Sequence, residues 1–355
     1  MTAFPFFAGR VRRGVSKRST DRRLRAVLYH HVTDHDSPLV DDLHVRTPPD
    51  VFESHIRTMA RYYEFVSLDD VLTEALPRRA ALVTFDDGYR SIVEYALPVL
   101  RKFGIPSVFF VTGACLQRRS LPLDNLLSHC CATVGIDRLA AALDPASRVA
   151  RTLPHLVALI ATMPYSRRLR LGDELGERFE LDQARLRSES ELFLDPDDLA
   201  GLAAYGCEVA NHTRTHLFCR AIVDEASANE EFVEHAQRLE SLTGRPVRAF
   251  SYPYGYRADA TDMVERVLRE SGHAASFLAE SRPHVAGASG RLWNRVSLDG
   301  CPPRRIGPAL EVMPALRVVR DRLRRSALSQ TSLAGRSSLF SAPLAEGSGP
   351  EDGEL

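Results

Sequence analysis

Residues 82–89 read "LVTFDDGY", an apolar run that ends in two adjacent carboxylates and a glycine. Leu82–Phe85 has the composition of a buried strand, and Gly88 closes a turn directly after it. Two neighbouring acids repel one another, and a strand end beside a core is an unfavourable place for charge. This stretch alone leaves two explanations of Asp86 and Asp87 open, a solvated turn and a functional pair.

The composition is that of a soluble globular protein. The chain has 355 residues, of which 44% are hydrophobic and 26% charged, so it can build a sizeable core. Lys+Arg and Asp+Glu both number 46, which gives no indication of a nucleic-acid partner. No apolar run approaches the roughly 20 residues of a membrane-spanning helix, and residues 1–9 are too short for a signal peptide. The sequence therefore favours the cytoplasm, and it does not indicate an oligomeric state.

Both ends of the chain differ in composition from its middle. Residues 8–25 are strongly basic, so we expect residues 1–24 to form a flexible arm that is able to rest on an anionic membrane surface. Residues 326–355 are rich in Ser, Gly and Ala and predict a disordered tail, which leaves 25–325 as the folded domain. The cysteines show no disulfide-framework spacing and are expected to be reduced thiols: Cys115, Cys130, Cys131, Cys207, Cys219 and Cys301.

Strand-like and helix-like segments alternate along most of the chain. The expected strands are 25–32, 80–85, 105–113, 207–213, 247–255, 273–279 and 292–298. The expected helices are 49–63, 67–76, 89–104, 195–206, 221–243 and 259–272. This alternation predicts an α/β fold, a distorted (β/α) barrel with about seven parallel strands.

Residues 114–194 interrupt the alternation. They contain helical patches such as "LDNLLSHC" and "LPHLVALIATM" but no convincing strand. A structureless loop of this length is rare inside a compact domain, so we expect a mostly helical insertion.

Polar residues follow several of the expected strands at the same end. Asp86 and Asp87 follow one strand, His212 ends another, Tyr254 follows a third, and His30 lies near the end of the first. In (β/α) barrels the chemistry is carried at the carboxyl ends of the strands. The five residues therefore predict a functional site at that rim.

The segment "NHTRTH" places His212 and His216 four residues apart. On a helix such residues share one face about 5–6 Å apart, a spacing that suits one metal ion, although an isolated H-x-x-x-H is often coincidental. Two imidazoles and one carboxylate form a catalytic zinc set with an open position. Cys207 and Cys219 flank the pair and leave a closed Cys2His2 site conceivable, but strand alternation directs Cys207 away from His212. Asp87 is the better third ligand.

Three ordered motifs, "TFDDG" (84–88), "HTRTH" (212–216) and "YPYG" (252–255), resemble those of the polysaccharide deacetylases of carbohydrate esterase family four, which share the NodB-homology domain. The stretches "VLYHHV" and "LHVRTPPDVFESHIRTMARYYEFVSLDDVL" resemble the front end of a subgroup in which an N-terminal element completes the site. The resemblance covers roughly residues 25–113 and 195–300.

The resemblance implies a role for each strand-end residue. Asp86 is the implied general base, and the backbone N–H of Tyr254 is the implied oxyanion donor. His30 matches the subgroup's "YH" element and is the expected general acid, with His31 as the less favoured neighbour. The implied metal ligands are Asp87, His212 and His216.

The third motif departs from the family pattern. Many members have an arginine where this chain has Ser251, so the residue that would orient the general base is missing there. Arg295 is the candidate replacement. Trp293, the only tryptophan, is either the floor of a sugar subsite or a core anchor. Asn211 either orients the metal ligands or caps the turn.

The expected reaction is metal-dependent hydrolysis of N-acetyl groups on the amino sugars of an acetylated glycan or glycolipid. Zn²⁺ is the favoured ion, with Co²⁺, Ni²⁺ and Mn²⁺ as alternatives. A metal-dependent amidohydrolase with a non-glycan substrate and a non-catalytic glycan-binding protein are the competing hypotheses. The second predicts loss of metal ligands, yet the residues are all present: Asp86, Asp87, His212 and His216.

Overall fold

The fold is a closed barrel of seven parallel strands, seen here in a computed structural model that describes residues 23–144, 152–281 and 291–312. Its strands are β1 (Arg23–Tyr29), β5 (Arg79–Phe85), β6 (Ser107–Val111), β7 (Glu208–Asn211), β8 (Ala249–Ser251), β9 (Ala275–Leu278) and β10 (Leu292–Ser297). They follow the order β1-β10-β9-β8-β7-β6-β5, and β5 pairs with β1 to close the ring. The predicted (β/α) barrel is confirmed.

Three short strands lie outside the ring. They are β2 (His31–Val32), β3 (Arg46–Thr47) and β4 (Glu64–Phe65). Strand β4 pairs with the beginning of β5, where β6 does not reach, and β2 pairs only with β3. The sequence predicted one strand over 25–32, but the structure divides it at His30. This break brings His30 to the rim of the barrel.

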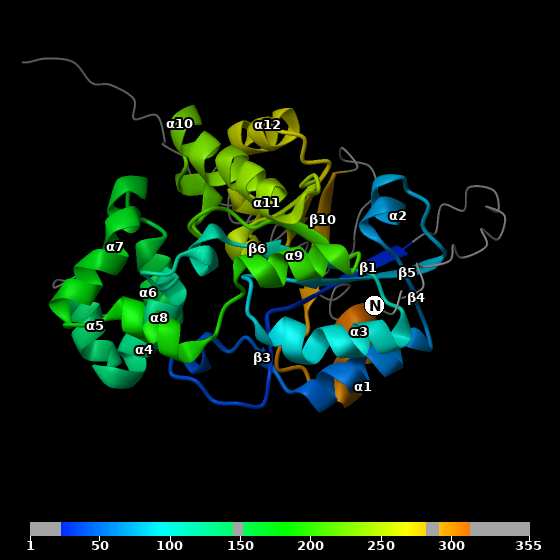
Figure 1. The fold of residues 1–355 in the computed structure, drawn as a ribbon, viewed down its shortest axis with the longest axis horizontal. Helices are drawn as coiled ribbons and strands as arrows, with labels where there is room; N and C mark the ends of the chain where they lie inside the picture. Colours follow the sequence, from blue (N-terminus) through cyan, green and yellow to red (C-terminus); the bar gives the residue numbers. More distant parts are fainter. Residues whose placement is uncertain (1–22, 145–151, 282–290, 313–355) are drawn as a thin grey trace, which may run out of the picture.

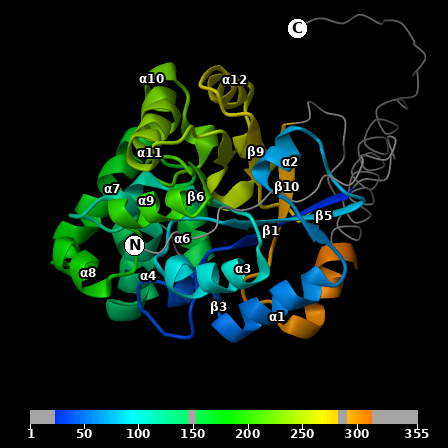
Figure 2. The same cartoon turned by 45° about the vertical axis from the view of Figure 1, so that its right-hand side comes forward.

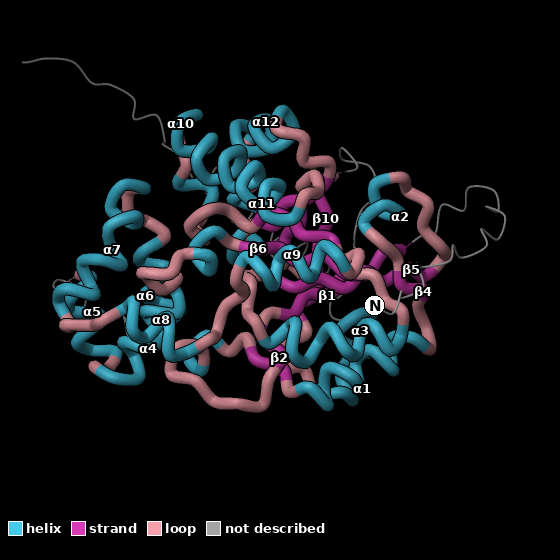
Figure 3. The backbone as a smooth tube through the Cα atoms, viewed as in Figure 1, coloured by secondary structure: helices cyan, strands magenta, loops and turns pink. Residues whose placement is uncertain are grey.

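Helices surround the barrel and form a separate group at one side. They are α1 (Pro49–Ala60), α2 (Leu68–Leu72), α3 (Leu97–Phe103), α4 (Leu123–Thr133), α5 (Ile136–Leu143), α6 (Leu153–Ile160), α7 (Tyr165–Arg178), α8 (Gln183–Ser190), α9 (Pro196–Ala204), α10 (Glu225–Ala228), α11 (His235–Thr243) and α12 (Asp262–Glu270). Helices α4 to α8 make up the expected insertion and gather at the left in Figure 1 and Figure 2. Figure 3 shows the strands enclosed by helices.

Short helical turns complete the secondary structure. They are η1 (Asp41–Leu43), η2 (Ile92–Ala96), η3 (Gly113–Leu116), η4 (Cys219–Ala221), η5 (Asn229–Glu234), η6 (Pro253–Gly255), η7 (Arg257–Asp259), η8 (Pro303–Arg305) and η9 (Pro308–Val312). The predicted helix 221–243 begins later, at α10, because the Asp224 side chain caps it by accepting from Ser227 N–H, and it continues through η5 into α11. The predicted strand 247–255 is reduced to β8, since the chain turns at Pro253.

Strand alternation divides the core into two parts. Along β5, Ala80 and Leu82 belong to the cluster inside the barrel, whereas Val83 and Phe85 pack outward against helices. Trp293 lies in the interior cluster and is 5% exposed, so the structure places it as a core anchor. The outward cluster also includes apolar residues of α4 to α7, which joins the insertion to the barrel through one continuous core.

Both expected terminal segments lie outside the described residues. This holds for residues 1–22 of the basic arm and for 313–355, which include the tail expected at 326–355. Strand β1 begins at Arg23, two residues before the expected start of the domain. Among the described residues, no helix has the length and apolar character needed to span a bilayer.

Three buried histidines carry depressed pKa values. Burial is the main cause for each, and it lowers the pKa of His31, His235 and His273 to about 4. Nearby cations add to the effect, Arg46 at His31 and Arg291 at His273. An unfolded histidine titrates near 6.5. These groups therefore stay neutral in the fold at a pH where the unfolded chain is protonated.

The metal-free protein should lose stability as the pH falls from 6.5 to 5. In this window the unfolded chain gains protons that the three buried histidines do not take up, which costs about 2 kcal/mol for each at pH 5. Above pH 6.5 these three histidines are neutral in both states, so their contribution to the slope disappears. Denaturant unfolding at a series of pH values measures the effect. His235→Gln should reduce the pH dependence of the free energy of unfolding by the contribution of one histidine. His155→Gln changes an exposed histidine and should leave this pH dependence unchanged. Equal pH dependence in the two variants would contradict the assignment.

Candidate metal centre and active site

The turn after β5 sends its two carboxylates in different directions. Asp86 has the same parity as the inward-facing residues of β5, so its side chain points into the barrel, where it is 3% exposed. Asp87 has φ 73° and Gly88 has φ 102°, so the chain reverses sharply over two residues. A Cβ at residue 88 would lie 2.7 Å from Cys115 Sγ, which only glycine avoids. Asp87 leaves the strand direction and faces the end of β7.

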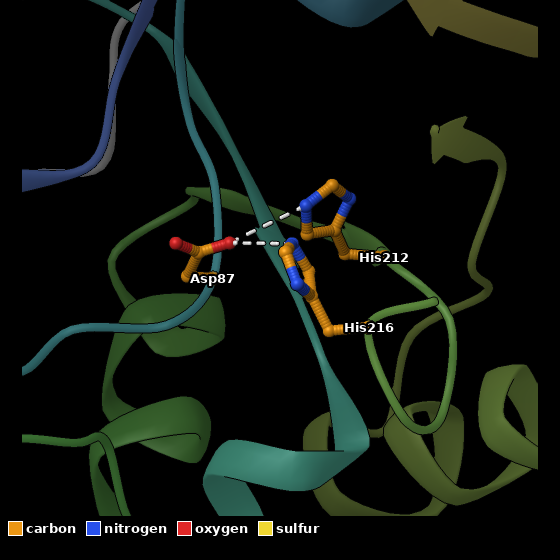
Figure 4. A group of neighbouring side chains, drawn as sticks. All are labelled: Asp87, His212 and His216. Carbon is orange, nitrogen blue, oxygen red and sulfur yellow. Dashed lines mark ion pairs between the residues drawn. The ribbon is translucent and has the colours of Figure 1, made fainter. Parts of the chain in front are cut away.

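One oxygen of Asp87 faces both histidines of the "HTRTH" motif. Asp87 Oδ1 lies 3.4 Å from His212 Nε2 and 3.2 Å from His216 Nε2 (Figure 4). This oxygen is buried and has no hydrogen-bond partner. Buried carboxylate oxygens without donors are rare, and a carboxylate with two imidazole nitrogens is a donor set that suits a divalent cation. Among the described residues, these three form the one group with metal-binding geometry.

The two histidines converge through a strained loop, and this differs from the helix on which the spacing argument relied. Thr213 and His216 have φ values of 65° and 54°. Thr213 Oγ1 accepts the His216 N–H at 2.9 Å, and Asn211 Oδ1 accepts the Thr213 N–H at 2.9 Å. Asn211 thus caps the turn. Positive φ at a β-branched residue is unfavourable and is kept only where the surroundings enforce it.

A hydrogen bond donated by Nδ1 orients each imidazole. His212 Nδ1 lies 2.8 Å from the carbonyl oxygen of Ser251, and His216 Nδ1 lies 2.7 Å from Asp124 Oδ2. Both partners are acceptors, so each Nδ1 carries a proton and each Nε2 is left as a ligand toward Asp87. Without a metal, burial disfavours protonation of His216, but Asp87 and Asp124 outweigh it and raise the pKa of His216 to about 10.

Asp124 is a site residue that the sequence analysis did not identify. It lies in the first turn of α4, inside the insertion, and both its oxygens also accept from Tyr254 Oη, at 3.0 and 3.1 Å. Tyr254 in turn stacks on Phe218 with ring centroids 3.9 Å apart. The only available signal was an acid in the helical patch "LDNLLSHC", and one acid at a helix start does not distinguish a site from a helix end.

Arg295 reaches Asp86 across the top of the barrel interior. Its Nη1 and Nη2 donate to Asp86 Oδ1 and Oδ2 at 2.6 and 2.7 Å, and the Ser251 hydroxyl donates to Oδ2 at 3.2 Å. Arg295 is fully buried and its guanidinium lies 5.2 Å from the centre of the Phe110 ring. Burial opposes ionisation of Asp86, but the charge of Arg295 prevails and lowers the pKa of Asp86.

His30 forms a second histidine–carboxylate pair at the rim. Its Nδ1 lies 2.7 Å from Asp299 Oδ2, and its backbone N–H donates to Asp299 Oδ1 at 3.1 Å. Burial disfavours the imidazolium, but Asp299 outweighs it and raises the pKa of His30 to about 9. His31 faces elsewhere, with Nδ1 2.7 Å from Ser91 Oγ and its ring against Tyr89. The sequence indicated His30 but not Asp299.

The site residues line one cleft of about 550 Å³. Its floor is formed by His30, Asp86, Asp87, Asp124, His212, His216 and Tyr254. Neither Cys207 nor Cys219 joins the metal-binding group, and Trp293 does not line the cleft. The side chain of Tyr254 contacts Asp124, while its backbone has φ 59°.

Comparisons with known proteins bear on the family and on the fold. Residues 73–275 match the sequence profile of the polysaccharide deacetylase family. No curated protein sequence matches the chain. The fold is similar to that of the Streptococcus pyogenes deacetylase PplD, solved in complex with acetate, with a TM-score of 0.55 and 13% identity over 82% of this chain and 100% of that chain.

Two further solved structures have a similar fold. A putative polysaccharide deacetylase from Bacillus anthracis aligns with a TM-score of 0.52 at 15% identity, over 82% of this chain and 69% of that chain. A polysaccharide deacetylase from Bacillus cereus aligns with a TM-score of 0.52 at 14% identity, with the same coverage. At these identities the likeness establishes the fold.

Arg295→Leu should lower the free energy of unfolding by about 3–5 kcal/mol, because it leaves Asp86 charged and unpaired inside the barrel. The double variant Asp86→Asn/Arg295→Leu should recover much of that loss. Denaturant unfolding of the metal-free proteins measures both. Arg248→Leu is the matched control, since its pair with Glu208 is partly exposed and should cost less than about 1 kcal/mol. A loss for Arg295→Leu no larger than the control's would contradict this account.

Asp124→Asn should weaken binding of a divalent metal by about 10–100-fold, because an uncharged amide is a weaker acceptor than the carboxylate for the Nδ1–H of His216. Titration of the apoprotein with Zn²⁺ or Co²⁺ measures the affinity. Asp173→Asn changes an exposed acid of the same insertion and should leave it unchanged. Equal affinities for the two variants would show that Asp124 does not support the site.

Proposed function

Because the chain belongs to the polysaccharide deacetylase family, we propose that it removes N-acetyl groups from the amino sugars of a glycan or glycolipid in a metal-dependent reaction. Family membership makes the protein a hydrolase that acts on carbon–nitrogen bonds other than peptide bonds and deacetylates glycans. The convergence of His212 and His216 on one unpartnered oxygen of Asp87 supports the metal-dependent part of the proposal.

Asp87, His212 and His216 would hold the metal ion. A divalent ion bound there polarises a carbonyl group and lowers the pKa of a coordinated water. A set of two histidines and one carboxylate favours Zn²⁺, with Co²⁺, Ni²⁺ and Mn²⁺ as the other candidates. Ser251 and Asp124 keep the two imidazoles in the tautomer that this role requires.

Asp86 serves as the general base. Its pair with Arg295 keeps the carboxylate ionised at neutral pH and fixes both of its oxygens. The carboxylate accepts the proton of the attacking water as the bond to the acetyl carbon forms. Arg295 is therefore a positioning residue, and it occupies the role that the missing arginine of the third motif would have had.

His30 serves as the general acid. The carboxylate of Asp299 keeps its imidazole protonated at neutral pH, so a proton is available when the carbon–nitrogen bond breaks. The proton goes to the leaving nitrogen, which departs as an amine, and the acetyl group leaves as acetate. The backbone N–H of Tyr254 is proposed to donate to the oxyanion of the tetrahedral intermediate, a contact worth about 3–4 kcal/mol.

The cytoplasmic location and the contact of the basic arm with a membrane stay predictions from the sequence. A hydrolase with a non-glycan substrate would use the same residues, so the substrate distinguishes that alternative. A non-catalytic binding protein would release no acetate under any condition.

Acetate release from N-acetylglucosamine oligomers by the metal-loaded protein tests the proposal. Asp86→Asn should reduce kcat by at least 100-fold while metal content stays near that of the unaltered protein, because the base is lost and the ligands remain. Asp87→Ala should lose metal and activity together. Chelation should abolish turnover of the unaltered protein, and added Zn²⁺ or Co²⁺ should restore it. Metal binding and acetate release that both survive Asp87→Ala would refute the ligand assignment.

A further inference from the structure

Helix α6 of the insertion is apolar around most of its circumference. Its sequence "LPHLVALI" contains no charged residue. Leu153, Leu156 and Ile160 are buried in the main core. A helix that is apolar beyond its core-facing stripe is ordinarily enclosed on all sides. Here Pro154 and Ala158, four residues apart, are exposed to solvent.

The exposed face of α6 forms a wall of the catalytic cleft. The apolar wall consists of Leu153 at the start of α6, of Pro154, Val157 and Ala158 along it, and of Ala161 and Thr162, which directly follow it. The same cleft contains the metal-binding residues and His30, so the apolar wall is continuous with the proposed catalytic centre. The segment before β3 lines the cleft as well, with Leu43 and Val45 alternating with Asp42 and His44.

The two sides of the cleft suit different chemical groups. Next to the metal centre lie Phe218, Tyr254 and Tyr256, whose rings suit the face of a sugar. In the apolar wall only Thr162 has a polar side chain, and its hydroxyl donates to the carbonyl oxygen of Leu159. Sugar hydroxyls placed against this wall would lose water without gaining a partner, which is unfavourable.

We infer that the substrate is an amino sugar that carries an aliphatic chain, and that the apolar wall of α6 binds this chain. The inference rests on the proposed function and defines its substrate class as a glycolipid instead of a long polysaccharide. A cleft of about 550 Å³ lies within the size range of sites for small ligands, so it accommodates one sugar and the first part of a chain. The chain's contribution is uniform binding, which lowers KM and leaves kcat unchanged.

Glycosides of N-acetylglucosamine with methyl and hexyl aglycones, used below their micelle concentrations, test the inference. Each fully buried methylene contributes about 0.8 kcal/mol, or about fourfold. Partial burial of five added methylenes should lower KM at least tenfold for the hexyl glycoside, with kcat unchanged. Chito-oligosaccharides of increasing length should show no comparable gain. A KM that falls with the number of sugars and not with aglycone length would overturn the inference.

Ala158→Glu and Ala158→Lys place either sign of charge on the apolar wall. In both variants the KM advantage of the hexyl glycoside over the methyl glycoside, at least tenfold in the unaltered protein, should disappear. His155→Glu is the matched control, because His155 is exposed on the same helix but does not line the cleft. Thermal unfolding of each variant verifies that the fold is retained. A hexyl advantage that survives both Ala158 variants would show that α6 is not the binding surface.

Calorimetric binding of hexyl and methyl glucosaminides, the deacetylated products, separates this inference from the proposed function. If no glycoside is hydrolysed, the proposed function fails, yet tighter binding of the hexyl compound that Ala158→Glu abolishes would still establish the aliphatic site. Equal binding of the two compounds overturns the inference even where acetate is released.

Discussion

The buried pair of Asp86 and Arg295 is the interaction on which the site depends. Each charge lies inside a barrel whose interior cluster is largely apolar, so neither is tolerable there without the other. Barrel closure sets them opposite one another, because β1 pairs with β5 on one side and with β10 on the other, with Ala26 in register with Arg295. The pair holds the first carboxylate inward at the strand end. The second must then turn outward, toward the histidines.

Backbone strain accompanies that turn throughout the site. Asp87, Thr213, His216 and Tyr254 all have positive φ, although none is glycine. Such conformations cost on the order of 1–3 kcal/mol each and persist where surrounding contacts enforce them. Hydrogen bonds provide these contacts. The side chains of Asn211 and Thr213 hold the loop that carries the two histidines, and Asp124 accepts hydrogen bonds from both His216 and Tyr254. Stability supplied by the barrel and its core holds three loops in conformations that they would not adopt alone.

The sequence predicts the barrel fold and the residues at its strand ends, because these follow from hydrophobic periodicity and from the order of the strands. Seven buried strands that alternate with helices indicate a barrel, and the carboxyl ends of its strands share one rim. This shared position indicates a site formed by Asp86, Asp87, His212 and His30. Asp124 and Asp299 were not identified, because each lies in a segment whose local pattern carries no such signal, and only tertiary contact makes it a partner of a histidine. The helical spacing that the sequence argument assumed for His212 and His216 is absent for a related reason. Capping by Asn211 and Thr213 favours a turn over the i, i+4 geometry.

The insertion connects the candidate metal centre to the proposed substrate cleft. Helix α4 supplies Asp124 to His216 and contacts α6, whose apolar wall lines the same cleft. Both helices belong to one hydrophobic core that continues into the barrel, so they form one packed unit rather than a loose appendage. A change that repacks this unit will therefore shift substrate binding and metal affinity together. The barrel provides the proposed metal ligands, acid and base, whereas the insertion supplies the Asp124 acceptor of His216 and, by our inference, the surface that binds the substrate's aliphatic chain.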